Sequence, residues 1–152
     1  MKILADADAL PSAVREMLCR ASQRVGIRLV FVANTRIDHP RSEWIACEVV
    51  EAGPDEADHR IVEMTSPGDL IVTADIPLAD RVVEKGATAL NPRGNLYDAE
   101  TVRQAKVMRD LMSELRDLDI RTGGPAPFSQ KDKQAFANRL DRFLTAYTKN
   151  KK

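Results

Sequence analysis

Short apolar runs and amphipathic stretches alternate along the first two thirds of the chain. The continuous apolar runs at 2–5, 29–32 and 70–73 are typical of strands that are buried on both faces of a sheet. Further strands are predicted over 45–50 and 88–90, and apolar residues at helical spacing separate several of these runs. This order predicts an α/β fold with a mostly parallel central sheet and helices on its faces.

Residues that start and stop helices bound the amphipathic stretches. Pro11 opens the first predicted helix and Gly26 ends it. A second helix begins near Asp55, and a third has Pro77 in its first turn, where the missing N–H group costs little, and ends at Gly86. Strand and helix are therefore expected to alternate through this part of the chain, with a polar loop over 35–43 between the second and third strands.

The final third of the sequence predicts two further helices, each with one apolar stripe. The first stripe is formed by Met108, Leu111, Met112, Leu115 and Leu118. The second stripe is formed by Phe136, Leu140, Phe143, Leu144 and Tyr147. Both stripes are predicted to be core rather than binding grooves.

Length and composition place the chain among ordinary globular proteins. Its 152 residues, 43% hydrophobic and 30% charged, predict one domain over 1–152, with a helical segment over about 98–148 packed on it and a basic tail at 149–152. The 23 basic and 23 acidic residues balance, so net charge does not favour a nucleic-acid partner or exclude one. Two separate cysteines exclude a zinc signature. Neither a signal peptide nor a membrane-length apolar run is present, so a soluble, cytoplasmic protein is expected.

Aspartates follow several of the predicted strands. Asp6 and Asp8 come after the first strand, Asp58 lies beyond the third, and Asp75 follows the strand over 70–73. Because the carboxyl ends of parallel strands open onto one crevice, these carboxylates are expected to approach one another. Like charges brought together favour a bound cation, so a hard divalent metal is predicted. Asp8 is either a second ligand or the cap of the following helix.

The remaining acids also have two readings. Asp55 and Asp58 share one face of a helix, and Asp58 ranks above Asp55 as a ligand. Asp75 can cap the next helix, or it can present oxygen atoms to the crevice together with Thr73. Carboxylate and hydroxyl oxygens are the ligands that Mg²⁺ and Mn²⁺ prefer.

An all-aspartate set of this kind indicates metal-assisted phosphoryl chemistry, in which a metal ionises water and steadies the leaving oxygen. Asn34, at another strand end, could orient the water or a phosphate, and Thr73 is a further candidate for substrate binding. Arg93 and the backbone amides of Gly123 and Gly124 could bind a phosphate, although a plain helix stop is the favoured reading of the glycines.

Four motifs together resemble the YaiI/YqxD family of bacterial proteins. They are Asp6-Ala7-Asp8-Ala9 followed by Pro11, Thr73-Ala74-Asp75-Ile76-Pro77-Leu78-Ala79, Ala89-Leu90-Asn91-Pro92-Arg93-Gly94 and Thr122-Gly123-Gly124-Pro125. The likeness runs over nearly the whole chain. It implies a three-layer α/β/α PIN-like domain, whose relatives hold Mg²⁺ or Mn²⁺ with three or four acids.

By this resemblance, Asp6, Asp58 and Asp75 are the catalytic and metal-binding acids, with Asp55 beside Asp58. At one position that concerns the mechanism, this chain differs from many members of the family. Many family members have Cys-Pro after the Asp-Ala-Asp-Ala stretch, whereas this chain has Leu10-Pro11, which argues against a thiol mechanism.

The first functional hypothesis is a Mg²⁺- or Mn²⁺-dependent nuclease that hydrolyses phosphodiester bonds, with RNA preferred to DNA as substrate. The spacing of Asp6 and Asp8 also suits a haloacid-dehalogenase-like phosphatase, in which the first aspartate is the nucleophile and the second the acid/base. The third hypothesis is a non-catalytic PIN-like module that binds nucleic acid or protein. No membrane partner is expected, and the sequence leaves the substrate and oligomeric state open.

Overall fold

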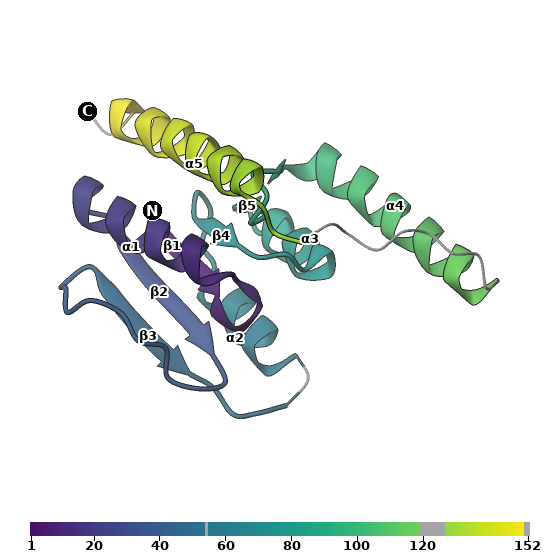
Figure 1. The fold of residues 1–152 in the computed structure, drawn as a ribbon, viewed down its shortest axis with the longest axis horizontal. Coiled ribbons are helices and arrows are strands. Elements are labelled where there is room, and N and C mark those ends of the chain that lie inside the picture. Colours follow the sequence, from purple (N-terminus) through teal and green to yellow (C-terminus); the bar gives the residue numbers. More distant parts are fainter. Residues whose placement is uncertain (54, 119–126, 151–152) are drawn as a thin grey trace.

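A six-stranded sheet forms the centre of the molecule (Figure 1). The computed structural model describes residues 1–53, 55–118 and 127–150. The strand order is β3-β2-β1-β4-β5-β6, with β1 to β5 parallel and β6 antiparallel to β5. The strands are β1 Lys2–Asp6, β2 Arg28–Ala33, β3 Ile45–Val49, β4 Leu70–Val72, β5 Thr88–Leu90 and β6 Leu96–Tyr97. The predicted α/β fold with a mostly parallel sheet is confirmed.

Helices cover both faces of the sheet, which gives three layers. The elements are η1 Ala7–Ala9, α1 Ser12–Val25, α2 Glu56–Met64, α3 Ile76–Glu84, α4 Ala99–Asp117 and α5 Gln130–Asn150. Side chains alternate across β1, so Ile3 and Ala5 pack in the core beneath α1 and α5, whereas Leu4 packs beneath α2 and α3. Within the described residues, no helix combines the length and the apolar character needed to cross a membrane.

The start and stop residues act as the sequence predicts. Gly26 ends α1 in the left-handed region, at a φ of 76°, where a glycine has no steric penalty. The Asp75 side chain caps α3, and Pro77 lies in the first turn of that helix. Helix α4 begins with a capping box between Asp98 and Thr101, which was not predicted.

Two local features depart from a regular alternation of strand and helix. Strands β2 and β3 are parallel neighbours, and residues 34–44, all of which the structure describes, join them without a helix. The polar loop predicted over 35–43 is therefore confirmed. Strand β6 was not predicted, because two residues are too short to display a period. It forms when the chain turns back at 91–95 and pairs with β5.

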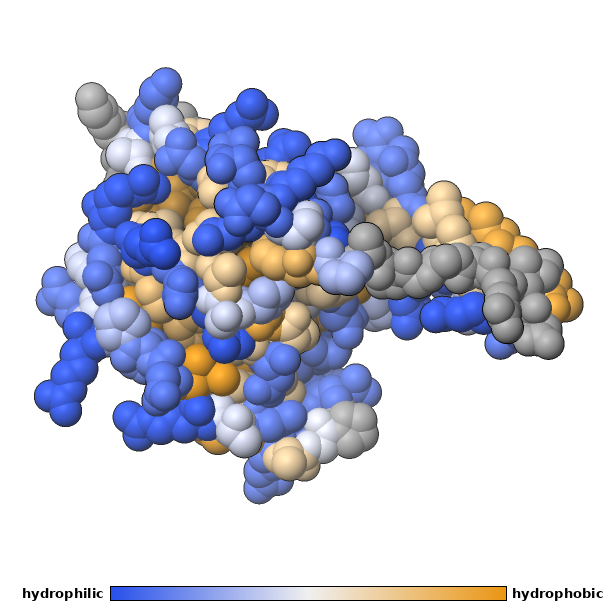
Figure 2. Space-filling model, in the orientation of Figure 1, coloured by the Kyte–Doolittle hydropathy of each residue, from blue (hydrophilic) through white to orange (hydrophobic). Residues whose placement is uncertain are grey.

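Helix α4 differs more strongly from the prediction, because most of its apolar stripe is exposed. Its first half packs against α3 through the buried Val102, and the Lys106 ammonium lies 3.1 Å from the Asp80 carboxylate. Its second half projects from the body of the protein and presents an apolar surface (Figures 1 and 2). Met108 is 53% exposed and Leu111 is 46% exposed. The prediction that this stripe is core is therefore wrong, because no described element covers the side of α4 opposite Val102.

Candidate active site

The strand order places one crevice at the carboxyl ends of β1 and β4. From β1 the chain crosses through α1 to β2, on one side of β1 in the sheet. From β4 it crosses through α3 to β5, on the other side, and α1 and α3 cover opposite faces. Such a switch point between neighbouring strands is where ligands bind in open α/β sheets. Asp6 ends β1 and Thr73 follows β4 directly, so both residues lie at this point.

The pairing of β1 with β4 brings Asp6 and Thr73 together. Ala5 is in register with Val72, so the next residue of each strand is a neighbour, and both side chains turn toward the α2 and α3 layer. The Thr73 hydroxyl donates a hydrogen bond of 3.0 Å to Asp6 Oδ2 and accepts one of 3.0 Å from the Asp75 backbone N–H. Thr73 therefore positions the Asp6 carboxylate and, through the Asp75 backbone, connects it to the start of α3.

The environment of Asp6 disfavours its charge. Burial is the largest cause that raises the pKa of Asp6 to about 6, the Thr73 hydrogen bond acts against it, and the charges of Asp58, Asp75 and Asp8 raise it further. No buried side-chain nitrogen or oxygen lacks a hydrogen-bond partner in the described residues. The second carboxylate oxygen of Asp6, to which no hydrogen bond is made, therefore reaches solvent. One oxygen is held and the other is available to a ligand.

Asp58 reaches the same crevice from α2. Burial raises its pKa, the charges of Asp75 and Asp55 add to this effect, and Arg81 and His59 oppose it. Asp55 precedes the helix in the left-handed region at a φ of 67°, and its side chain is exposed and makes no capping hydrogen bond. Asp58 is thus the acid that interacts with the other carboxylates of the crevice, whereas the Asp55 side chain is exposed to solvent. This agrees with the preference for Asp58 over Asp55 as a metal ligand.

Asp75 and Asp8 are both held by backbone amides. Asp75 Oδ1 accepts a hydrogen bond of 3.0 Å from the Leu78 N–H group and so caps α3. Asp8 Oδ2 accepts one of 2.7 Å from the Asn34 N–H group. The helix that follows Asp8 has Pro11 at its N-cap with no side-chain cap, so the reading of Asp8 as a helix cap is wrong. The Asn34 side chain itself is exposed.

The acids do not form a ready-made chelating group. Among the described residues, no three His, Cys, Asp or Glu side chains lie close enough together to hold a metal ion. The donor chemistry nevertheless fits Mg²⁺, which keeps several waters and needs one or two protein carboxylates together with substrate phosphates. Asp6 and Asp75 each have one carboxylate oxygen outside their described hydrogen bonds, and Asp58 adds its charge.

Comparison with known proteins assigns the family. The family model described as "Uncharacterized BCR, YaiI/YqxD family" matches residues 4–146. The chain belongs to the YaiI/YqxD family. A UPF0178 protein of Solidesulfovibrio magneticus is 54% identical over 99% of this chain and 100% of its own length. Similar proteins of Shewanella amazonensis and Syntrophotalea carbinolica are 53% and 51% identical, covering 98% and 97% of this chain and 100% and 99% of their own. No solved structure matches the chain.

The other family motifs occupy different surroundings. The Arg93 guanidinium forms an ion pair of 2.7 Å with Asp132 on α5, which gives this side chain a structural partner. Its predicted contact with a phosphate stays a prediction, as does the substrate role of Thr73, whose hydroxyl is buried between Asp6 and Asp75. Gly123 and Gly124 lie outside the described residues.

One basic residue of the site was not predicted. Arg81 on α3 lies with its Nη2 atom 3.3 Å from His59 Nδ1 on α2, and its charge lowers the pKa of Asp58. Nothing in the spacing of Asp58, His59 and Arg81 along the chain indicates this proximity. It arises only because α2 and α3 are packed side by side against the same face of the sheet.

Proposed function

We propose that this YaiI/YqxD protein is a Mg²⁺- or Mn²⁺-dependent nuclease that hydrolyses phosphodiester bonds, with RNA as the preferred substrate and DNA as the alternative. The main support is the state of Asp6. It is buried at the switch point, and its pKa is raised to about 6, chiefly because burial disfavours the charged form and further because Asp58, Asp75 and Asp8 are negative. A bound cation would supply the positive charge that balances the group.

Each acid has a distinct part in this proposal. Asp6, Asp58 and Asp75 would hold the ion, with Asp8 and Asp55 close enough to add negative charge. The chemistry that such an ion supplies is ionisation of water and stabilisation of the leaving oxygen. Thr73 keeps Asp6 oriented, and the cap to Leu78 keeps Asp75 oriented, so neither carboxylate has to be ordered when substrate arrives. Arg81 limits the repulsion around Asp58.

Metal binding is the first test. Mn²⁺ at millimolar concentration is expected to raise the unfolding temperature of the wild-type protein, since a ligand at a hundred times its Kd stabilises by about 2.7 kcal/mol. Asp6→Asn and Asp75→Asn should lose this response. Asparagine still caps a helix, so Asp75→Asn keeps α3 intact. Asp110→Asn, which removes the same charge from the exposed face of α4, is the matched control and should respond like the wild type.

The metal-free protein gives a second readout. The folded-state pKa of Asp6, about 6, lies above its ordinary value of 3.8, so the folded state is favoured at low pH and loses that advantage as the pH rises through 6. The loss amounts to about 3 kcal/mol. Asp6→Asn should therefore be more stable than the wild type at pH 8, and the gain should fall toward pH 4. Equal stability at pH 8 would contradict the proposed electrostatics.

Cleavage itself is tested with single-stranded, flapped and duplex RNA and DNA in the presence of Mn²⁺. Products should appear with wild-type protein and disappear with Asp6→Asn and Asp75→Asn, whereas Asp110→Asn keeps activity. Undiminished cleavage by Asp75→Asn would remove that residue from the catalytic set. If Asp8→Asn alone abolishes release of phosphate from a phosphomonoester, the phosphatase reading replaces the nuclease.

A second candidate function is a nucleic-acid-binding module without catalysis. The observation that favours it is the lack of three metal-binding side chains in close contact among the described residues. On this reading, oligonucleotide binding would be unaffected by Mn²⁺ and by Asp6→Asn, and no product would form under any metal condition.

A further inference from the structure

The two helical layers differ in charge. Within α1 and α5 there are eight basic and three acidic side chains, whereas α2 and α3 together have two basic and five acidic ones. The balanced composition of the whole chain conceals this asymmetry. The α1/α5 face therefore attracts polyanions, while the face that holds α2 and α3 repels them.

A groove runs along the basic face between the two helices. One section of about 590 Å³ is lined by Met17, Arg20, Ala21 and Arg24 of α1 and by Ala137, Asn138, Leu140 and Asp141 of α5. A second section of about 310 Å³ shares Arg24 and Asp141 with the first and continues to Thr148 and Lys149. Hydrophilic side chains interspersed with apolar surface cover this side of the molecule (Figure 2).

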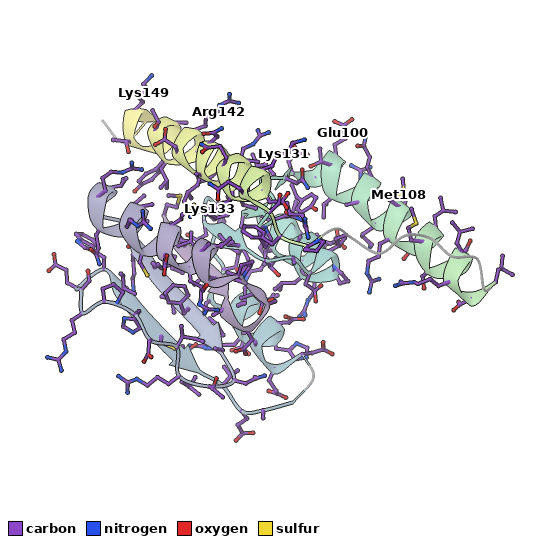
Figure 3. All side chains as sticks on the ribbon, in the orientation of Figure 1. Glu100, Met108, Lys131, Lys133, Arg142 and Lys149 are labelled. Atoms are coloured by element: carbon purple, nitrogen blue, oxygen red, sulfur yellow. The ribbon has the colours of Figure 1, made fainter. Side chains whose placement is uncertain are left out.

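Further cations form a row along the exposed side of α5 beside the groove, and of these only Lys149 lines the groove itself. Lys131, Arg142 and Lys149 are spaced by eleven and seven residues, which places them on one side of the helix (Figure 3). The row extends over 18 residues, or about 27 Å at 1.5 Å per residue. Arg20 and Arg24 of α1 line the groove. Charges spread over this length match a repeating anion better than a small one.

The groove residues lie in the middle and later turns of α1 and α5, and the earlier turns of both helices lead back to the candidate active site. Helix α1 begins where β1 and η1 end, and the start of α5 is held to the turn after β5 by the Arg93–Asp132 ion pair. Both helices therefore start at the sheet edge that contains Asp6 and Thr73 (Figure 1). The Asp6 side chain turns toward α2 and α3, so a strand leaving the groove would reach it across this edge.

We infer that the α1/α5 groove binds the phosphodiester backbone of a single-stranded nucleic acid and guides it to the crevice at Asp6. This inference rests on the proposed function for the choice of ligand. Helices α1 and α5 are packed against each other, as helices with axes about 8–10 Å apart are, so a ligand would lie in the surface groove above their contact. A single strand can follow such a groove, whereas a duplex is too wide to enter it. Arg20 and Arg24 are the principal phosphate contacts. Asp141, whose carboxylate lies 3.4 Å from Arg24, opposes binding.

The test measures binding of a labelled single-stranded RNA of about 16 nucleotides, a length within the range that such grooves occupy, as a function of salt. The slope of log affinity against log salt is about 0.7 per neutralised phosphate for single strands, so the Arg20→Gln/Arg24→Gln double variant should lower the slope by about 1.4. Its affinity at low salt should fall at least tenfold. Arg109→Gln/Arg116→Gln, an equal charge change on α4, should leave both values unchanged.

Two further measurements separate this inference from the proposed function. Asp141→Asn should tighten binding several-fold, because it removes a negative charge from the groove and releases Arg24. Hydrolysis of bis(p-nitrophenyl) phosphate with Mn²⁺ reports on the acids alone, so the groove variants should keep it, while Asp6→Asn should lose it and still bind RNA. The same oligonucleotide as DNA shows whether the 2′-hydroxyl contributes.

Equal effects of the α1 and α4 double variants would overturn the inference, as would duplex RNA binding as tightly as the single strand. Failure of the small phosphodiester to react, with groove-dependent RNA binding intact, would instead reject the nuclease and leave the groove assignment standing.

Discussion

Helices α4 and α5 have apolar stripes of the same helical spacing, but they end in opposite environments. Phe136, Leu140 and Leu144 of α5 are buried against α1 and the sheet. Met108 and Leu111 of α4 are exposed on the projecting half of the helix (Figure 2). The period of a stripe therefore indicates which side of a helix is apolar, whereas its burial depends on whether another element lies opposite it.

The largest expected contrast is between Phe136→Ala and Leu111→Ala. Removing the fully buried Phe136 ring should lower the free energy of unfolding by about 3–5 kcal/mol, because a cavity remains in the core. Removing the exposed Leu111 side chain should change it by less than about 0.5 kcal/mol. Urea denaturation measures both values. Similar losses in the two variants would mean that α4 is covered in solution.

The turn before β6 tests how closely α5 is docked. Gly94 has a φ of 92°, and a Cβ atom there would lie 2.7 Å from the carbonyl carbon of Ala135 on α5. Gly94→Ala should therefore destabilise the protein by about 2–3 kcal/mol through strain and displacement of the helix. Gly68→Ala is the control, since its φ of 88° gives similar strain but its Cβ atom would meet nothing within 4 Å. It should lose only about 1 kcal/mol. Equal losses would show that the α5 contact is loose.

Within α4 itself, the buried and exposed sides can be compared at two valines. Val102→Ala deletes two methyl groups from the core shared with α3, an expected loss of about 1–2 kcal/mol. Val107→Ala, which is 68% exposed in the wild type, should be nearly neutral. Thermal unfolding distinguishes them, and amide hydrogen exchange should be faster after residue 107 than before it. Uniform protection along α4 would contradict the division of the helix into anchored and projecting halves.

The smallest expected effect concerns the ion pair at the start of α5. Hydrogen bonds from Ser129 and the Arg93 charge lower the pKa of Asp132 below its ordinary value of 3.8. A lowered pKa adds stability above 3.8 that is lost as the pH falls through the folded-state value. Asp132→Asn should thus be slightly less stable than the wild type at pH 7, and the difference should vanish in acid. Asp80→Asn, which loses the more exposed pair with Lys106, should have a still smaller effect. A difference that persists at low pH would exclude the ion pair as its source.

Much of the fold follows from local patterns in the sequence. Apolar runs mark β1, β2 and β4 because strands of a parallel sheet are buried on both faces, and Gly26 and Pro77 bound helices for reasons of backbone geometry. The β2–β3 connection also follows from the sequence, because the polar residues over 35–43 predict a loop rather than a helix. Strand β6 is too short to have a pattern of its own.

In the candidate site too, some features follow from the sequence and others depend on the tertiary structure. The placement of Asp6 and Asp75 at strand ends follows from the chain order, and the common edge follows from parallel pairing. The bond between Thr73 and Asp6 depends on the register of β1 with β4, and the approach of Arg81 to Asp58 depends on the packing of α2 against α3. Residues 67 positions apart have no local signal of such contacts.

By itself, the sequence determined the order of the elements apart from β6, several helix ends and the edge of the sheet at which the acids gather, because these depend on backbone geometry and on the periods of apolar residues. Only the tertiary structure decided which stripe is buried, how charge is divided between the two faces and which oxygen of Asp6 reaches solvent. Burial and electrostatic coupling depend on what lies opposite a side chain, and that neighbour is contributed by a distant part of the chain.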